Sequence, residues 1–437
     1  MKYGYSIWMR LIVHISQLNE RIDKVAYLGI DVMRRRLAAK RPRCSLRYRF
    51  YEQKATGRSF DLLIPEDMKW VKPILGWCTK AVDSVANVLT FDRFKDDVLA
   101  LDEIFSMNSR DIFLDDAILS ALITSSAFVY ISAGRDGYPR LQVIDGPNAT
   151  GEIDPISKLL KEGYAILARD EHGQITTEGY FTAEETVIIE GGLSGKITHV
   201  PNPAGYPLLV PVINKPDAHR PFGHSRISRA CMEYQASAFR TLKLSEVSAA
   251  FYSNPQKYVS GLEPDAEFNG KYASVASFVR FDRDENGDKP TTGQYTAQTM
   301  TPYNDRLRMI ASLFAGETGL TLDDLGFYTE NPSTAEAINA AHEPLYRAAE
   351  KIQRSFSACL LNVGMVAACL RDRQPYERYV LRYTVPSWFP VERTSPSTLG
   401  AVGDAVYKLN EAAPGFIGED NMKKLTGLTS DSEGGAV

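Results

Sequence analysis

The stretch HRPFGHSRISRACMEYQASAFRTL, residues 219–242, marks the change from an irregular segment rich in proline and glycine to a long helix. Placed at 100° per residue, its apolar side chains share one arc and its charged side chains share another. The spacing therefore predicts a helix from about Ser225 to Tyr252 with one packed face and one wet face. The basic members of the predicted wet face are Arg226, Arg229, Arg240 and Lys243.

Gly223-His224-Ser225 also resembles the nucleophile elbow of a hydrolase, in which a histidine activates a serine at a sharp turn. An elbow needs a second glycine two residues after the serine, but Ile227 stands there, and no strand-like run precedes Gly223. As the N-cap of the helix, Ser225 would contribute about 1 kcal/mol. The pattern favours the cap over a catalytic serine.

The regions on either side of this helix have different periodicities. Helical spacing dominates residues 66–130, and short β-rich runs separated by turn signals follow between residues 128 and 213, as in an antiparallel meander. After the helix come a mixed segment at 254–300, a helix from about 301 to 317, a long helix from about 334 to 370, a strand over 379–385 and a helical tail from Pro396. These features predict an α+β protein with several domains.

Composition and charge exclude some classes of protein. The 437 residues are 44% apolar and carry a net charge of -4, which excludes a whole-chain polycation that coats nucleic acid. Residues 1–60 nevertheless carry a net charge of +10, so a nucleic-acid-binding module acting through residues 34–58 is one alternative. Five cysteines without a C-x-x-C pair predict reduced core thiols of a protein made in the cytosol. The apolar N-terminus is interrupted by Arg10 and is too short to span a membrane.

No motif predicts a metal or a nucleotide cofactor. His219 and His224 have the wrong spacing for one helix face, and Tyr346 stands where HEPLY would need its second histidine. EGGLSGK lacks the first glycine and the final Ser/Thr of a phosphate loop. DRDENGDKPTTG matches only the first half of a calcium loop, and its Asn-Gly predicts a hairpin turn.

The segment LTLDDLGFYTENPST, residues 320–334, is longer than the joining of two helices requires, and such loops are often functional. Asp323 and Asp324 could form a carboxylate pair for acid–base chemistry. No histidine, lysine or third acid stands near them in the sequence. A hydrolase that uses Ser225 or this pair therefore remains the weaker alternative.

Five pieces of the chain, in order, resemble the portal proteins of tailed double-stranded-DNA bacteriophages. They are RYRFYEQKA from residue 47, LGWCTKAVDSVANVLTFDRF from residue 75, the stretch from 219, AGETGLTLDDLGF followed by NPSTAEAINAAHEPLYRAAEKIQRSF between 315 and 356, and SPSTLGAVGDAVYKLNEAAPGFIGEDNMKKLTGLT from 395. The resemblance runs from about Arg34 to near the C-terminus.

The resemblance implies a portal-type division of the chain. Residues 1–223 would form a wing of helices and a β meander, 224–252 a stem helix, 253–300 a small clip, and 301–317 a second stem helix. Residues 318–334 would form a tunnel loop, 335–389 a long helix and a strand that return to the wing, and 390–437 a short crown.

The resemblance to portal proteins also implies a function that needs neither catalysis nor a cofactor. Similar proteins form twelve-fold rings at one capsid vertex of the virion, pass double-stranded DNA without sequence specificity, and bind the terminase and later a head-completion adaptor. Major capsid and scaffolding proteins are further implied partners, no membrane is implied, and assembly would occur in the host cytoplasm. Tunnel-loop residues expected to face DNA are Leu322, Asp323, Asp324, Phe327, Tyr328 and Asn331. Clip residues expected to contact terminase or adaptor are Lys257, Lys271, Arg280 and Arg283.

Overall fold

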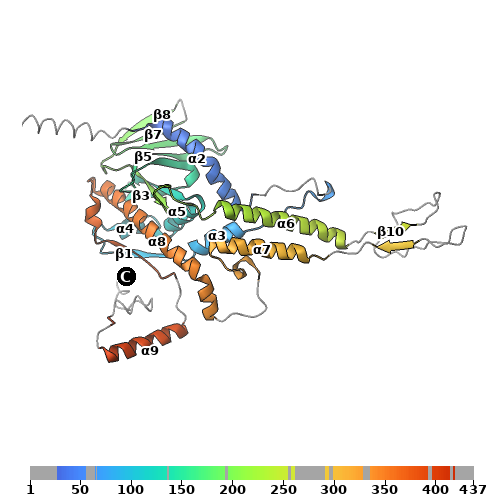
Figure 1. Cartoon of the computed structure of the whole chain (residues 1–437). Helices are drawn as coiled ribbons and strands as arrows, with labels where there is room; N and C mark the ends of the chain where they lie inside the picture. Colours follow the sequence, from blue (N-terminus) through green and yellow to red (C-terminus); the bar gives the residue numbers. More distant parts are fainter. Residues whose placement is uncertain are drawn as a thin grey trace, which may run out of the picture. The chain divides into compact units, whose positions relative to one another are not determined.

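A computed structural model describes residues 27–55, 64, 66–134, 137–191, 195–253, 257–260, 291–294, 299–327, 335–391, 396–413 and 417–418 (Figure 1). The chain divides into two compact units. The first is drawn from residues 1–51, 81–228 and 339–437, and the second from residues 52–80 and 229–338. Helices α3 (Trp77–Ala86) and α8 (Ala335–Asp372) each contain one of the points at which the chain changes units.

Two antiparallel sheets form the centre of the first unit. One has the strand order β3-β2-β9, and the other runs β4-β5-β6-β7-β8 in sequence order. The predicted meander is confirmed for the five-stranded sheet only, because the last strand of the predicted run, β9, pairs back with β2. The strands are β2 (Ser126–Ala133), β3 (Pro139–Ile144), β4 (Ala149–Ile153), β5 (Leu160–Arg169), β6 (Ile175–Phe181), β7 (Glu185–Glu190), β8 (Lys196–Pro201) and β9 (Leu209–Ile213). Every residue of β9 is buried, so the smaller sheet lies inside the unit.

Helices α2 (Ile30–Tyr51) and α5 (Arg110–Thr124) pack against these sheets, and α4 (Leu101–Ser106) contacts a further strand pair. The unit also contains α9 (Pro396–Ala412), and α3 and α8 are shared between the units. Short 3-10 turns occupy Glu66–Met68, Gly146–Asn148, Asp323–Leu325 and Arg378–Leu381 across the chain. Strand β1 (Phe91–Lys95) pairs with β12 (Val385–Trp388), so the strand predicted at 379–385 begins only at its last residue.

Helix α2 is held on the five-stranded sheet by apolar and polar contacts. Met33 and Leu37, one turn apart, pack against Tyr164 and Ile166 of β5. Glu162, which is only 2% exposed, accepts hydrogen bonds from the backbone N–H groups that precede the first turn of α2. A buried carboxylate thus satisfies donors that a helix start leaves without intrahelical partners.

Helix α8 is a core helix of 38 residues. Among the described residues, its span from Ala337 to Asp372 is long and apolar enough to cross a membrane, but 72% of the most apolar window is buried within the protein. A Cβ at Gly364 would lie 2.9 Å from a methyl carbon of Leu101, so glycine allows α4 to lie close against the helix. All five cysteines are buried and none forms a disulfide, as predicted.

The second unit is built on the helix pair α6 (Arg229–Ser253) and α7 (Thr301–Thr318). The side chains of Ser248 and Tyr303 meet at 2.8 Å between them. Trp77 packs on Phe314 with ring centroids 5.5 Å apart. Gln235 accepts from the Cys78 N–H at 2.7 Å and donates to the Leu75 carbonyl at 2.8 Å, which fastens the start of α3 to α6.

Strands β10 (Lys257–Ser260) and β11 (Thr291–Gln294) pair in an antiparallel two-stranded sheet. The helix predicted at 301–317 agrees with α7 to within one residue, and its assignment as a second stem helix stays a prediction. The predicted Asn286-Gly287 turn and the half calcium loop lie outside the described residues.

Candidate functional site

The loop that leads from β9 to α6 closes tightly on itself. The His224 N–H donates to the Asn214 carbonyl at 2.9 Å, and the Asn214 side chain donates to the His224 carbonyl at 2.7 Å. Gly223 has a φ of 71°, and a Cβ there would lie 2.1 Å from the Asn214 carbonyl oxygen. Only glycine fits this turn, because the backbone is left-handed and the chain passes too close for a side chain.

Ser225 is structural, but it is not the cap of α6, because that helix begins four residues later at Arg229. Its hydroxyl donates to the Ile123 carbonyl at 2.5 Å and accepts from the Ile227 N–H at 3.0 Å. The His224 ring bonds the Asp217 carboxylate at 2.5 Å. The serine and histidine are thus engaged with different partners, an arrangement that does not favour a hydrolase.

The predicted wet face of the first stem helix needs correction. Arg226 precedes the helix, and its Nε donates to the Ala81 carbonyl at 3.2 Å. Arg229 is exposed at the first residue of α6, and Arg240 pairs with Glu233 at 2.9 Å. Lys243 is only 4% exposed and therefore lies off the wet face. The helix buries a broader arc than its apolar residues define, because a lysine can bury its long aliphatic stem.

The start of the predicted tunnel loop is an ordered turn. The Asp324 carboxylate accepts from both the N–H and the hydroxyl of Thr321 at 2.9 Å, and the Phe327 ring lies 6.5 Å from Trp77. Asp323 is exposed and Leu322 is half-buried, whereas Tyr328 and Asn331 lie outside the described residues. The two aspartates therefore occupy different environments. The hydrogen bonds from Thr321 to Asp324 are those of a structural turn and do not favour an acid–base pair.

The clip residues are described only in part. Lys257 begins β10 and stands opposite Gln294 of β11. Lys271, Arg280 and Arg283 lie outside the described residues, so their roles stay predictions.

Part of the basic block binds the protein's own sheet rather than an external partner. Arg34 pairs with Glu178 at 2.6 Å, and Arg36 pairs with Glu152. Lys40 donates to the Ala149 carbonyl at 3.0 Å. These contacts argue against a binding module that uses the whole of residues 34–58. Sequence reasoning missed them because both carboxylates lie more than a hundred residues away.

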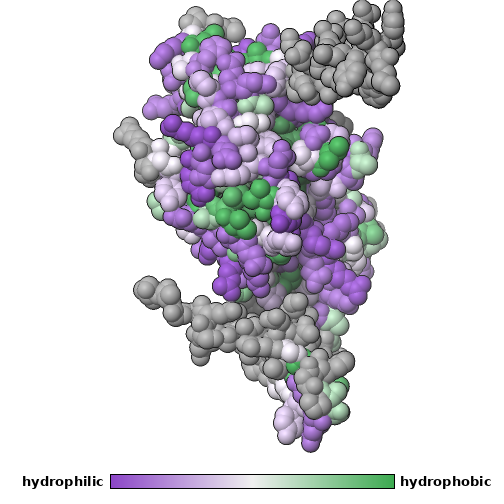
Figure 2. Space-filling model, turned by 90° about the vertical axis from the view of Figure 1, so that its left-hand side faces the viewer, coloured by the Kyte–Doolittle hydropathy of each residue, from purple (hydrophilic) through white to green (hydrophobic). Residues whose placement is uncertain are grey.

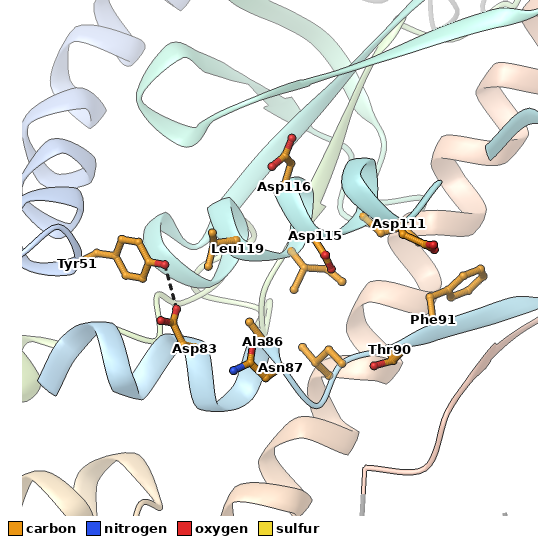
Figure 3. Close-up of a pocket in the computed structure, with 13 residues that line it drawn as sticks. Tyr51, Asp83, Ala86, Asn87, Thr90, Phe91, Asp111, Asp115, Asp116 and Leu119 are labelled. Atoms are coloured by element: carbon orange, nitrogen blue, oxygen red, sulfur yellow. Dashed lines mark hydrogen bonds between the residues drawn. The ribbon is translucent and has the colours of Figure 1, made fainter. Parts of the chain in front are cut away.

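A cavity of about 450 Å³ in the first unit was not predicted (Figure 3). Its thirteen lining residues include four aspartates and no basic side chain: Asp83, Asp111, Asp115 and Asp116. Tyr51 donates to Asp83 at 2.9 Å, and burial together with the two neighbouring aspartates raises the pKa of Asp115. Such a cavity repels phosphate. The described residues include no group of three His, Cys, Asp or Glu placed to hold a metal ion.

Comparison with known proteins gives one consistent group of relatives. No family model matches the sequence. The portal protein of Mycobacterium phage L5 is 25% identical over 406 residues, which cover 86% of this chain and 80% of the relative. The portal protein of Mycobacterium phage D29 is 24% identical over 412 residues, which cover 87% of this chain and 81% of the relative.

The solved structures that resemble the chain are more distant. The neck of a native gene transfer agent particle, computed with C12 symmetry, has a TM-score of 0.43 at 13% identity and covers 88% of this chain and 99% of the other. A chain from the virion of the native gene transfer agent particle has a TM-score of 0.39 at 12% identity, and the match covers 81% of this chain and 90% of the other. The weight therefore rests on the sequence relatives: over most of its length the chain is a homologue of proteins named portal protein in mycobacteriophages.

Proposed function

We propose that the chain is a phage portal protein that assembles into a twelve-membered ring at one capsid vertex. The ring is the conduit through which the terminase packages the genome and through which DNA leaves, and it carries the head-completion adaptor. The observation that carries the proposal is the similarity to two portal proteins over more than four-fifths of this chain. The ring is assembled in the host cytoplasm with scaffolding and major capsid proteins and resides in the virion.

The charge of the chain suits a conduit. DNA carries one negative charge per about 1.7 Å of its axis, so a lumen dense in basic side chains would hold it. Twelve copies of a chain with a net charge of -4 carry -48 in total, which repels the polymer. Passage without sequence preference needs no base-reading side chains.

Exposed apolar side chains in the second unit support association with further copies. Trp70 and Ile74 are 76% and 73% exposed, and Met309 and Leu313 on α7 are 57% and 48% exposed. Figure 2 shows that apolar patches also interrupt the mostly hydrophilic surface on one face of the molecule. Met309 and Leu313 lie one turn apart on α7, and exposed apolar side chains that adjoin one another are typical of protein contact sites. We assign Met309 and Leu313 to the contact between subunits.

The hydrolase alternative has little support. Ser225 is hydrogen-bonded to backbone groups, His224 is bonded to Asp217, and Asp324 is held by Thr321. A conduit requires none of these groups to be reactive.

Mass photometry with negative-stain microscopy tests the proposal. A twelve-membered ring of 48.7-kDa chains has a mass near 584 kDa and a central hole. A protein that stays monomeric across a wide range of salt concentration would refute the assignment.

Two variants sharpen this test. Leu313→Asp places a charge on the proposed contact and is expected to reduce the fraction of rings. Ile156→Asp is the matched control, because Ile156 is 90% exposed in the first unit and outside the proposed contact. Equal loss of rings in both variants would contradict the contact assigned to α7.

A further inference from the structure

A cluster of basic side chains in the first unit surrounds the loop between β9 and α6. It draws on helix α2, on the loop itself and on helix α8. We call it the cationic patch, and its members are Arg43, Arg47, Lys215, Arg220, Arg226 and Lys351. Arg43, Arg220 and Lys351 are exposed, and the other three are half-buried.

Hydrogen bonds fix one end of the patch. Arg47 Nε donates to the Ile227 carbonyl at 3.3 Å, which places its guanidinium next to the backbone that follows Arg226. Arg43 lies one helical turn earlier on α2, so both side chains project from the same side of the helix. The tight Gly223 turn then brings Arg220 to the same region, and this arginine is close enough to lower the pKa of Arg47.

The other end of the patch is fixed by α8. The Ser355 hydroxyl donates to the Ile213 carbonyl at 2.8 Å, which anchors α8 at the end of β9. Lys351 lies one turn before Ser355, and Lys215 follows Ile213 by two residues. The two lysines therefore flank one anchored point, and Arg226 lies within electrostatic range of Lys215.

The charges of the patch repel one another. Burial, and then the neighbouring Arg226 and Lys351, lower the pKa of Lys215. Burial also lowers the pKa of Arg47, with further contributions from Arg43 and Arg220. An added anion would relieve this repulsion.

Among the described residues, no ion pair with a carboxylate is formed by Arg43, Arg47, Lys215, Arg220 or Lys351, in contrast to the neighbouring arginines of α2. On the same helix, Arg34 and Arg36 each have a carboxylate partner from the sheet. The one acid between residues 214 and 227 is Asp217, and its carboxylate is bonded by His224 and by the Arg220 N–H. The surface thus presents several cations to a ligand that carries more than one negative charge.

We propose that the cationic patch binds phosphate groups of the double-stranded DNA backbone without reading its sequence. The inference rests on the proposed function, which brings DNA to this protein, and it names the part of the chain that DNA contacts. Arginine and lysine side chains from three separate elements span several positions, as contacts to successive phosphates require. A chain that is acidic overall then has one local surface that attracts the polymer.

Fluorescence anisotropy with a labelled 40-base-pair duplex, measured between about 50 and 200 mM salt, tests this inference on the assembled full-length protein. The test variant reverses the three exposed members, Arg43→Glu, Arg220→Glu and Lys351→Glu. The control variant makes the same change in net charge at exposed lysines elsewhere in the first unit: Lys161→Glu, Lys196→Glu and Lys408→Glu.

Each phosphate contact adds about 0.9 to the slope of log affinity against log salt concentration. We expect the test variant to lower that slope by about 3 units and the affinity by more than about tenfold, whereas the control stays close to the wild type. Equal slopes in the two variants, or a wild-type protein that does not bind the duplex, would overturn the inference.

Mass photometry of the same samples separates this inference from the proposed function. If the wild type forms rings but the test variant binds DNA as tightly as the control does, only the inference is overturned. If the wild type forms no rings, the portal assignment is overturned. If the test variant alone loses its rings, the patch is a contact between subunits and the phosphate assignment is wrong.

Discussion

Replacing Glu162 measures how much one buried carboxylate contributes to holding helix α2 on its sheet. Its oxygens accept from the Leu28 N–H at 2.8 Å, the Gly29 N–H at 3.2 Å and the Tyr180 hydroxyl at 2.6 Å. Burial and the bond to Glu162 raise the pKa of Tyr180, so the hydroxyl stays protonated and donates at neutral pH. The carboxylate is only 2% exposed, so water does not replace a lost bond.

The structure sets the size of the effect. Glu162→Gln keeps one carbonyl oxygen for Leu28 but turns an amide towards the Gly29 N–H, which loses one charge-assisted bond worth about 1.5–3 kcal/mol. Tyr180 can rotate its hydroxyl and accept from the new amide. Glu162→Ala removes all three acceptor contacts and leaves two backbone N–H groups without an acceptor, so we expect a loss of about 3–5 kcal/mol.

Hydrogen–deuterium exchange of the α2 amides is the appropriate assay, because a chain of this size does not unfold in a single step. A loss of 1.5–3 kcal/mol corresponds to exchange that is about ten- to a hundredfold faster in Glu162→Gln. The matched control is Glu171→Gln, which makes the same chemical change at an exposed position in the β5–β6 turn. If both Glu162 variants protect α2 as well as the control does, the carboxylate does not hold the helix.

Three further changes have defined outcomes. Burial lowers the pKa of Lys40 from 10.5 to about 8, so the unfolded chain binds a proton that the folded chain releases between these values. The wild type should therefore gain thermal stability as pH rises from about 8 to about 10, and Lys40→Met should lack that gain in a melting series. Gly223→Ala, which must place a Cβ against the Asn214 carbonyl in a left-handed turn, should destabilise the loop between β9 and α6 by about 2–4 kcal/mol, measured as faster hydrogen–deuterium exchange of its amides, and unchanged exchange would contradict this geometry. Ser225→Ala should cost about 1–2 kcal/mol of local stability in the same exchange measurement, because it removes the bond to the Ile123 carbonyl, and should leave ring mass unchanged; loss of a measurable hydrolysis on this substitution would revive the catalytic alternative.

The sequence predicted helices and strands well where the local periodicity of apolar residues determines them. Helix α7 starts at the predicted Thr301, and the meander follows from alternating runs separated by turns. The start of α6 was misplaced by four residues because Ser225 has the chemistry of a cap, yet its hydroxyl serves the end of α5 instead. Local signals of this kind do not reveal which distant backbone a side chain will meet.

The candidate site was predictable only in outline. Helical spacing assigned Lys243 to the wet face, but burial of that position depends on packing that no local pattern encodes. The basic block looked uniform in sequence, whereas the fold divides it into residues that pair with Glu152 and Glu178 and residues such as Arg43 that face outward. Contacts over more than a hundred residues decide that division.

The two helices that change units have a consequence for any attempt to dissect the protein. A fragment that ends at Lys80 would divide α3, and one that ends at Ile338 would keep only the first turn of α8. Each cut would create a helix end whose backbone groups lose their intrahelical partners. A cut at either boundary therefore leaves a divided helix, and the newly synthesised chain must reach α8 before the second unit has all its residues.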